Sequence, residues 1–174
     1  MSDRKTTIRQ RLTEARELLL HATAALDDTS IVASTENPQW RVHDILAHVA
    51  ASERGMLRNV DRFLAGGDLP SGFSLDTWNQ RQVDKRREAS VEELLSELAA
   101  SRAETWAMLD RLSEADLDVR GLHPAGLRTT VAGLFLTIAN HELDHGNEIR
   151  TVVGLPILMT ADWQQALQPE DRRE

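Results

Sequence analysis

The stretch Ile138-Ala-Asn-His-Glu-Leu-Asp-His-Gly-Asn-Glu-Ile149 places two histidines four residues apart within an apolar pattern of helical period. Residues at this spacing lie on one face of an α-helix, one turn apart. The pattern therefore predicts a helix whose buried face carries both histidines. Thr129 or Thr130 is expected to cap this helix, and Gly154 and Pro156 to end it. Its buried stripe consists of Leu134, Ile138, His141, His145, Ile149 and Val152.

Three further segments repeat apolar residues at helical spacing, and strand-like alternation is absent. The first helix is expected from about residue 5 to 27, and the second from Trp40 to the Gly66-Gly67 pair. The third is expected to begin at Ser90, which forms a capping box with Glu93. Four long amphipathic helices predict an all-α, four-helix-bundle fold.

The remaining segments are shorter or more polar. A short extra helix over a partly exposed surface is expected between the second and third helices, from Ser74 to Glu88. A turn of helix followed by a loop is expected for residues 113–128. The chain reads as a single domain over residues 1–174, with its core at about 5–155 and a polar tail at 156–174.

Composition excludes several classes of function. Lys and Arg total 20 against 28 Asp and Glu, a net charge of −8, which argues against nucleic acid as a partner. No apolar run is long enough to cross a membrane and no signal-peptide core is evident, so a cytoplasmic protein is expected. The chain has no cysteine, so any thiol chemistry needs a thiol from outside.

A third histidine, His48, follows Ile45 by three residues and falls on the inner side of its own helix. A single inward histidine is usually a core residue that is hydrogen-bonded to a neighbour. Three of them on two helices would leave ring nitrogens without partners, at roughly 1–3 kcal/mol each. A divalent cation would satisfy one nitrogen of each ring, so the pattern predicts a metal site with open coordination positions.

The other polar residues near these positions have simpler interpretations. Glu142 and Asp144 are expected on a solvated face, whereas Glu53 or Glu148 could orient a metal-bound imidazole. The spacing His141-Glu-Leu-Asp-His145 also matches a metalloprotease signature, but the absence of strands and the upstream position of His48 argue against a protease. The remaining histidines are expected at the surface; they are His21, His43 and His123.

Taken together, three motifs resemble the DinB-like (YfiT-like) superfamily of metalloenzymes. This superfamily includes the N-terminal domain of mycothiol-dependent maleylpyruvate isomerase, and the resemblance covers about residues 5–155. The motifs are Trp40-Arg-Val-His-Asp-Ile-Leu-Ala-His48, Asp76-Thr-Trp-Asn79, and His141 and His145 followed by Asn147 and Ile149-Arg150.

The resemblance implies an up-down-down-up bundle that binds one divalent metal through His48, His141 and His145. Zinc is the first candidate, with nickel or iron as alternatives, because three histidines do not select among them. It also implies a homodimer and an external thiol such as mycothiol or bacillithiol. The isomerase has a glutamate in place of one histidine ligand, a departure that this chain does not share. It also has an additional C-terminal domain that this chain lacks, so the resemblance does not by itself imply isomerase activity.

Three functions remain open from the sequence. The first is a thiol-dependent S-transferase or detoxifying enzyme that acts on a small electrophile. The second is a metal-dependent hydrolase, since a bound cation can lower the pKa of water to about 7. The third is a non-catalytic bundle that binds a small molecule or metal. Asn79 is the candidate for orienting the substrate, with a capping or bridging role in its short helix as the alternative.

Overall fold

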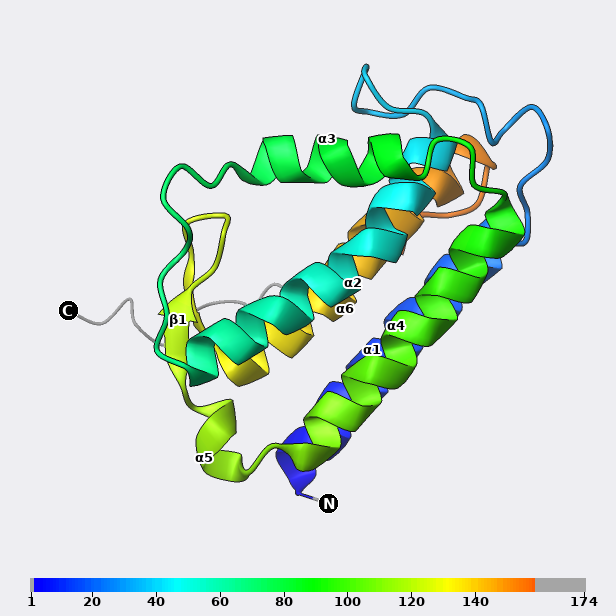
Figure 1. Ribbon diagram of the computed structural model, residues 1–174. Coiled ribbons are helices and arrows are strands. Elements are labelled where there is room, and N and C mark those ends of the chain that lie inside the picture. Colours follow the sequence, from blue (N-terminus) through cyan, green and yellow to red (C-terminus); the bar gives the residue numbers. More distant parts are fainter. Residues whose placement is uncertain (1, 159–174) are drawn as a thin grey trace.

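Four long helices make up the bundle in the computed structural model, which describes residues 2–158. They are α1 (Asp3–Thr23), α2 (Val42–Leu64), α4 (Val91–Arg111) and α6 (Val131–Val152). The helix α1 packs along α6, while α2 packs against both α4 and α6 (Figure 1). This arrangement confirms the predicted all-α bundle. The predicted order of helix directions stays a prediction, and residues 159–174 of the expected tail lie outside the described residues.

Side-chain caps fix the ends of these helices. Ser90 Oγ accepts a hydrogen bond from the Glu93 amide at 3.2 Å, and the Glu93 carboxylate accepts from the Ser90 amide at 2.7 Å. This capping box confirms the predicted start of α4. Thr130 caps α6 by accepting from the Gly133 amide at 3.0 Å. Gly154, with φ of 72°, lies just beyond the end of α6, as the sequence predicts.

The first two helices are shorter than predicted. The helix α1 ends at Thr23 because Asp27 starts a local turn: its carboxylate accepts from the Ser30 amide at 2.7 Å. Such side-chain bonds compete with continuation of a helix. The helix α2 begins at Val42 rather than Trp40, since the Asp44 carboxylate accepts from the Arg41 amide at 2.9 Å and caps the helix there.

The connections hold two further helices and a hairpin. The helix α3 (Leu75–Lys85) confirms the short helix predicted between the second and third long helices, and α5 (Glu114–Leu117) is the expected single turn. The loop predicted after α5 was wrong, because β1 (Arg120–Leu122) and β2 (Arg128–Thr130) pair as an antiparallel hairpin. Strands of three residues are too short to show alternation in the sequence.

The core consists of two apolar clusters separated by a charged layer. Each long helix contributes one buried charged residue to a network of ion pairs inside the bundle. These four residues, called the ionic layer below, are Arg16, Glu53, Arg102 and Glu142. Each side chain is at most 10% exposed, so four charges from four helices meet inside the bundle.

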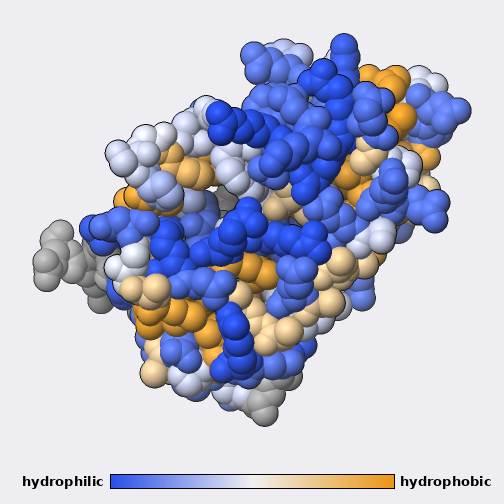
Figure 2. Space-filling model, in the orientation of Figure 1, coloured by the Kyte–Doolittle hydropathy of each residue, from blue (hydrophilic) through white to orange (hydrophobic). Residues whose placement is uncertain are grey.

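The outer surface is mostly hydrophilic on the face that Figure 2 shows. Apolar side chains reach this face mainly near the end of the bundle that carries α5. Among the described helices, none is both long and apolar enough to cross a membrane. The charged outer faces and the apolar inner stripes are the pattern that water-exposed bundle helices require.

Candidate metal centre

The histidine cluster forms where α2 packs against α6. His48 comes from α2, and His141 and His145 come from adjacent turns of α6. Their candidate ligand nitrogens all lie within 4.8 Å of one another. The two Nε2 atoms of His48 and His141 are 2.8 Å apart, and the rings of His141 and His145 lie 4.5 Å apart between centroids. Three imidazoles therefore converge on one point.

Burial keeps two of these imidazoles neutral. It lowers the pKa of His48 to about 3, with a further contribution from the nearby His145. Burial also lowers the pKa of His141 well below its usual value, and the two neighbouring histidines act in the same direction. The neutral imidazole is the form that binds metal ions, so the pair is ready for a cation near neutral pH.

Residues around the cluster hold the rings in place. His145 Nδ1 lies 2.7 Å from Glu148 Oε1, and because a carboxylate only accepts, this nitrogen is the protonated one. Nε2 of His145 is thereby left with its lone pair for a metal. The ring of Trp40 packs against His48 at 4.9 Å between centroids, and Ser52 Oγ lies 3.4 Å from His48 Nδ1.

The donor set fits a divalent transition metal. Zn–N bonds of 2.0–2.1 Å in a tetrahedral site place the ligand nitrogens about 3.3 Å apart. The nitrogens of His48 and His141 are slightly closer than this, at 2.8 Å, and the full set spans no more than 4.8 Å. Side-chain rotations would bring all three to bonding distance, and three neutral imidazoles leave coordination positions for water or a substrate.

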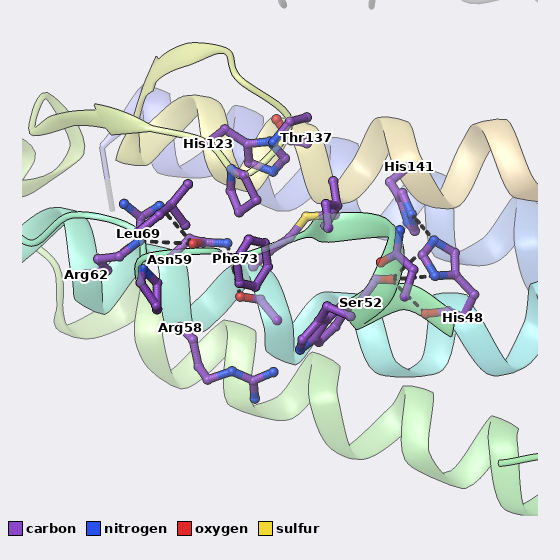
Figure 3. Close-up of a pocket in the computed structure, with 18 residues that line it drawn as sticks. His48, Ser52, Arg58, Asn59, Arg62, Leu69, Phe73, His123, Thr137 and His141 are labelled. Carbon is purple, nitrogen blue, oxygen red and sulfur yellow. Dashed lines mark hydrogen bonds between the residues drawn. The ribbon is translucent and has the colours of Figure 1, made fainter. Parts of the chain in front are cut away.

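A cavity of about 430 Å³ opens from the cluster. His48 and His141 lie at one end of it (Figure 3), and residues of α2, α3 and the hairpin turn form its walls. Asn79, the predicted substrate-orienting residue, lines it from α3 together with Trp78. A volume of this size accommodates a small molecule.

The carboxylates differ from the sequence-based expectations in two places. Glu142 is 1% exposed, not solvated, because it accepts hydrogen bonds from Arg16 and Arg102. Glu53 does not orient a histidine: it is 2% exposed and accepts from Arg102 at 2.7 Å. Glu148 does contact a histidine, and Asp144 is exposed as expected.

The ionic layer also has a signal in the sequence. Arg16 lies four residues after Leu12, on the buried side of α1, and Arg102 lies four residues after Leu98 on α4. A charged residue in phase with an apolar stripe indicates a buried ion pair. The cavity residues Arg62 and His123 carried no comparable signal, since their positions depend on the loops that fold over α2.

Comparisons with known proteins agree with the helical-bundle fold. Mycothiol-dependent maleylpyruvate isomerase has a similar fold, with a TM-score of 0.67 at 16% identity. A mutant of that isomerase with one histidine replaced by alanine gives a TM-score of 0.66 at 15% identity. Both similarities cover 92% of this chain, which spans 65% of the isomerase chain. No curated protein gives a significant match. The family model of the DinB superfamily matches residues 11–149, and the chain therefore belongs to that superfamily.

Proposed function

We propose that this protein is a divalent-metal-dependent enzyme that transfers a low-molecular-weight thiol to a small electrophile. The observation that carries the proposal is the position of His48 and His141, whose rings form one end of a cavity large enough for a small substrate. A ligand that fills this cavity meets the imidazoles directly. His48 is buried, with 5% exposure, and His141 and His145 are half-buried.

His48, His141 and His145 would hold the metal, with zinc as the first candidate and nickel or iron as alternatives. A divalent cation held there supplies the positive charge that stabilises a thiolate near neutral pH. Glu148 holds the His145 ring in one tautomer. The apolar cavity walls, which include Met56 and Phe73, exclude water from the sulfur.

The thiol comes from outside the chain, because the sequence contains no cysteine. Mycothiol and bacillithiol are the candidates, and the fold shared with a mycothiol-dependent isomerase supports this choice. In the transfer, the sulfur electron pair forms the new bond to carbon, and the leaving group departs with the electron pair of the broken bond. The thiol proton is released to solvent or to the leaving group.

Asn79 is proposed to orient the electrophile. Its carboxamide lines the same cavity as His48 and His141, and it carries both a donor and an acceptor for a carbonyl-containing substrate. Asn79→Ala is expected to raise KM for the electrophile and to leave metal content unchanged. Asp76→Ala, at an exposed position of the same helix, is the matched control and is expected to change neither.

Elemental analysis tests the metal centre. Plasma mass spectrometry on protein that has met neither chelator nor a nickel column is expected to find about one transition metal per chain. His145→Ala is expected to lose it, and His21→Ala, on the exposed side of α1, to retain it. Full metal content in the His145→Ala protein would remove this residue from the proposed ligand set.

A thiol screen tests the reaction. Electrophiles are incubated with the protein and mycothiol, bacillithiol or glutathione, and the loss of free thiol is followed. Consumption that needs both the protein and its metal supports the transferase. Turnover that persists without any thiol indicates the hydrolase instead, and tight ligand retention without turnover indicates a binding bundle.

The homodimer is part of the same proposal and is supported by membership of the superfamily. Light scattering coupled to size-exclusion chromatography measures it directly. A mass of twice the chain mass of 19.5 kDa is the expected result, and the monomer mass would contradict it.

A further inference from the structure

The cavity is cationic although the chain is acidic. The chain has 28 acidic and 20 basic residues, yet none of the 18 residues that line the cavity is Asp or Glu. Two arginines, Arg58 and Arg62, line it together with His123. A wall that carries positive charge without carboxylates favours an anionic ligand and disfavours a cationic one.

The positive charge of Arg62 lies far from the histidine cluster. His48 and Arg62 are both on α2, and their separation of 14 residues corresponds to about 20 Å along the helix axis. Figure 3 shows His48 and His141 at one end of the cavity and Arg62 and Asn59 at the other. The rest of the lining is largely apolar and includes Met56, Leu69, Phe73 and Trp78.

The guanidinium of Arg62 is oriented by neutral groups. It donates to Asn59 Oδ1 at 2.9 Å and to the Leu122 carbonyl at 2.7 Å, with a longer bond to the Gly67 carbonyl at 3.3 Å. Other arginines of the chain contact carboxylates instead, such as Arg54 with Glu104 and Arg86 with Glu97. Arg62 is thus held in position while its charge keeps no direct carboxylate partner within the described residues.

Two N–H donors at this end of the cavity have no acceptor among residues 2–158. A guanidinium has five N–H groups, and four hydrogen bonds from Arg62 are made, two of them to the same Asn59 oxygen. His123 Nδ1 accepts from the Ala125 amide at 3.1 Å, so in the neutral ring Nε2 carries the proton and donates. Burial lowers the pKa of His123, and the Arg62 charge lowers it further, which favours this neutral form.

We propose that Arg62 and His123 bind a carboxylate at the far end of an elongated ligand whose other end reaches the histidine cluster. The two remaining N–H donors match the two oxygens of a carboxylate, and the arginine charge compensates its negative charge. The exposed Asp68 acts on the Arg62 charge from outside the cavity lining. The assignment of the histidine end rests on the function proposed above, whereas the carboxylate end does not.

Either the thiol or the electrophile supplies the carboxylate. The variant Arg62→Gln distinguishes these two possibilities. Glutathione and bacillithiol carry carboxylates, whereas mycothiol does not. With a neutral electrophile, Arg62→Gln raises KM for glutathione or bacillithiol if the thiol supplies the group. With mycothiol as the thiol, it raises KM for an acidic electrophile if the electrophile supplies the group.

Binding of simple thiols tests the proposal without turnover. Metal-loaded protein is titrated calorimetrically with ω-mercaptocarboxylic acids of increasing chain length and with the matching ω-mercaptoalcohols. Once the chain is long enough to reach Arg62, the acid is expected to bind about ten- to a hundred-fold more tightly than the alcohol. Arg62→Gln is expected to abolish this preference and to leave alcohol binding unchanged.

The matched control is Arg54→Gln, which removes an arginine of α2 whose carboxylate partner lies outside the cavity. It is expected to keep the preference for the acid. Equal affinities for acid and alcohol at every length would overturn the proposal. So would an Arg62→Gln protein that binds both probes more weakly by the same factor, since that result indicates only a structural role.

A separate titration keeps this proposal distinct from the metal centre. Metal-free protein is titrated with decanoate and with decanol, and tryptophan fluorescence is followed. Preference for decanoate that Arg62→Gln removes supports the carboxylate site even if no metal loads, in which case only the proposed function fails. Absence of the preference in a protein that does bind metal and thiols overturns the carboxylate site alone.

Discussion

Arg102 Nη2 lies 2.8 Å from Glu142 Oε1 inside the bundle, and Glu142 lies three residues before His145 on α6. Glu142 also follows His141 in the chain, so the same carboxylate that ties α6 to α4 is adjacent in sequence to the histidine cluster. The second carboxylate of the ionic layer, Glu53, lies on α2 five residues after His48. The ionic layer therefore anchors both helices that supply the histidines.

Removing Glu142 is expected to destabilise the protein strongly. Glu142→Ala leaves Arg16 and Arg102 buried without one of their two carboxylates, and breaking a buried pair in this way costs about 3–5 kcal/mol. The free energy of unfolding, measured in urea, is expected to fall by this amount. Asp61→Ala removes an exposed ion pair with Arg111 and is expected to cost less than about 1 kcal/mol. Equal losses in the two variants would contradict the central role of the ionic layer.

Glu148 is expected to control metal affinity rather than stability. Its hydrogen bond fixes the tautomer of His145, and loss of such a partner lowers metal affinity about 10- to 100-fold. Glu148→Gln is therefore expected to release its metal to a chelator at a lower concentration, with little change in the unfolding midpoint. Glu17→Gln removes an exposed carboxylate of α1 and serves as the control. The same chelator competition curve for Glu148→Gln and the wild type would show that Glu148 does not support His145 as a metal ligand.

The metal-free protein is expected to lose stability as the pH falls from 6.5 towards 3. The pKa of His48 is about 3 in the folded protein against 6.5 in an unfolded chain, so only the unfolded chain binds a proton between these values. The contribution of His48 to the free energy of unfolding is fully present above pH 6.5 and decreases as the pH falls below that value. Urea midpoints measured across this range are expected to show a shallower decline for His48→Gln than for the wild type. Parallel curves would contradict this assignment.

A side chain at Gly121 is expected to destabilise the protein. A Cβ at this position of β1 would lie 2.3 Å from the ring of Phe63, which is 2% exposed and cannot easily move. Overpacking of this kind costs about 1–3 kcal/mol, so Gly121→Ala is expected to lower the free energy of unfolding by that amount. Adding Phe63→Leu should relieve part of the clash. The double variant should therefore lose less free energy of unfolding than the sum of the losses in the two single variants. Strict additivity would show that the two residues do not contact.

Local patterns in the sequence were enough to predict the helices. Apolar residues at a period of 3.6 mark the buried face of each long helix, and this pattern needs no knowledge of the partner. The capping box of Ser90 and Glu93 acts within one turn, so it too is readable from the sequence. The hairpin escaped prediction because its pairing joins two short segments through backbone hydrogen bonds rather than through a side-chain pattern.

The sequence by itself determined the helical bundle and the placement of His141 and His145 on one face of α6, because helix geometry alone relates residues four apart. Only the tertiary structure decided that His48 meets that pair, that Glu142 is buried against Arg102, and that the cavity ends at Arg62. Each of these is a contact between segments distant in the chain. Periodicity tells which side of a helix is buried, but the residue it meets there is set by how the helices pack.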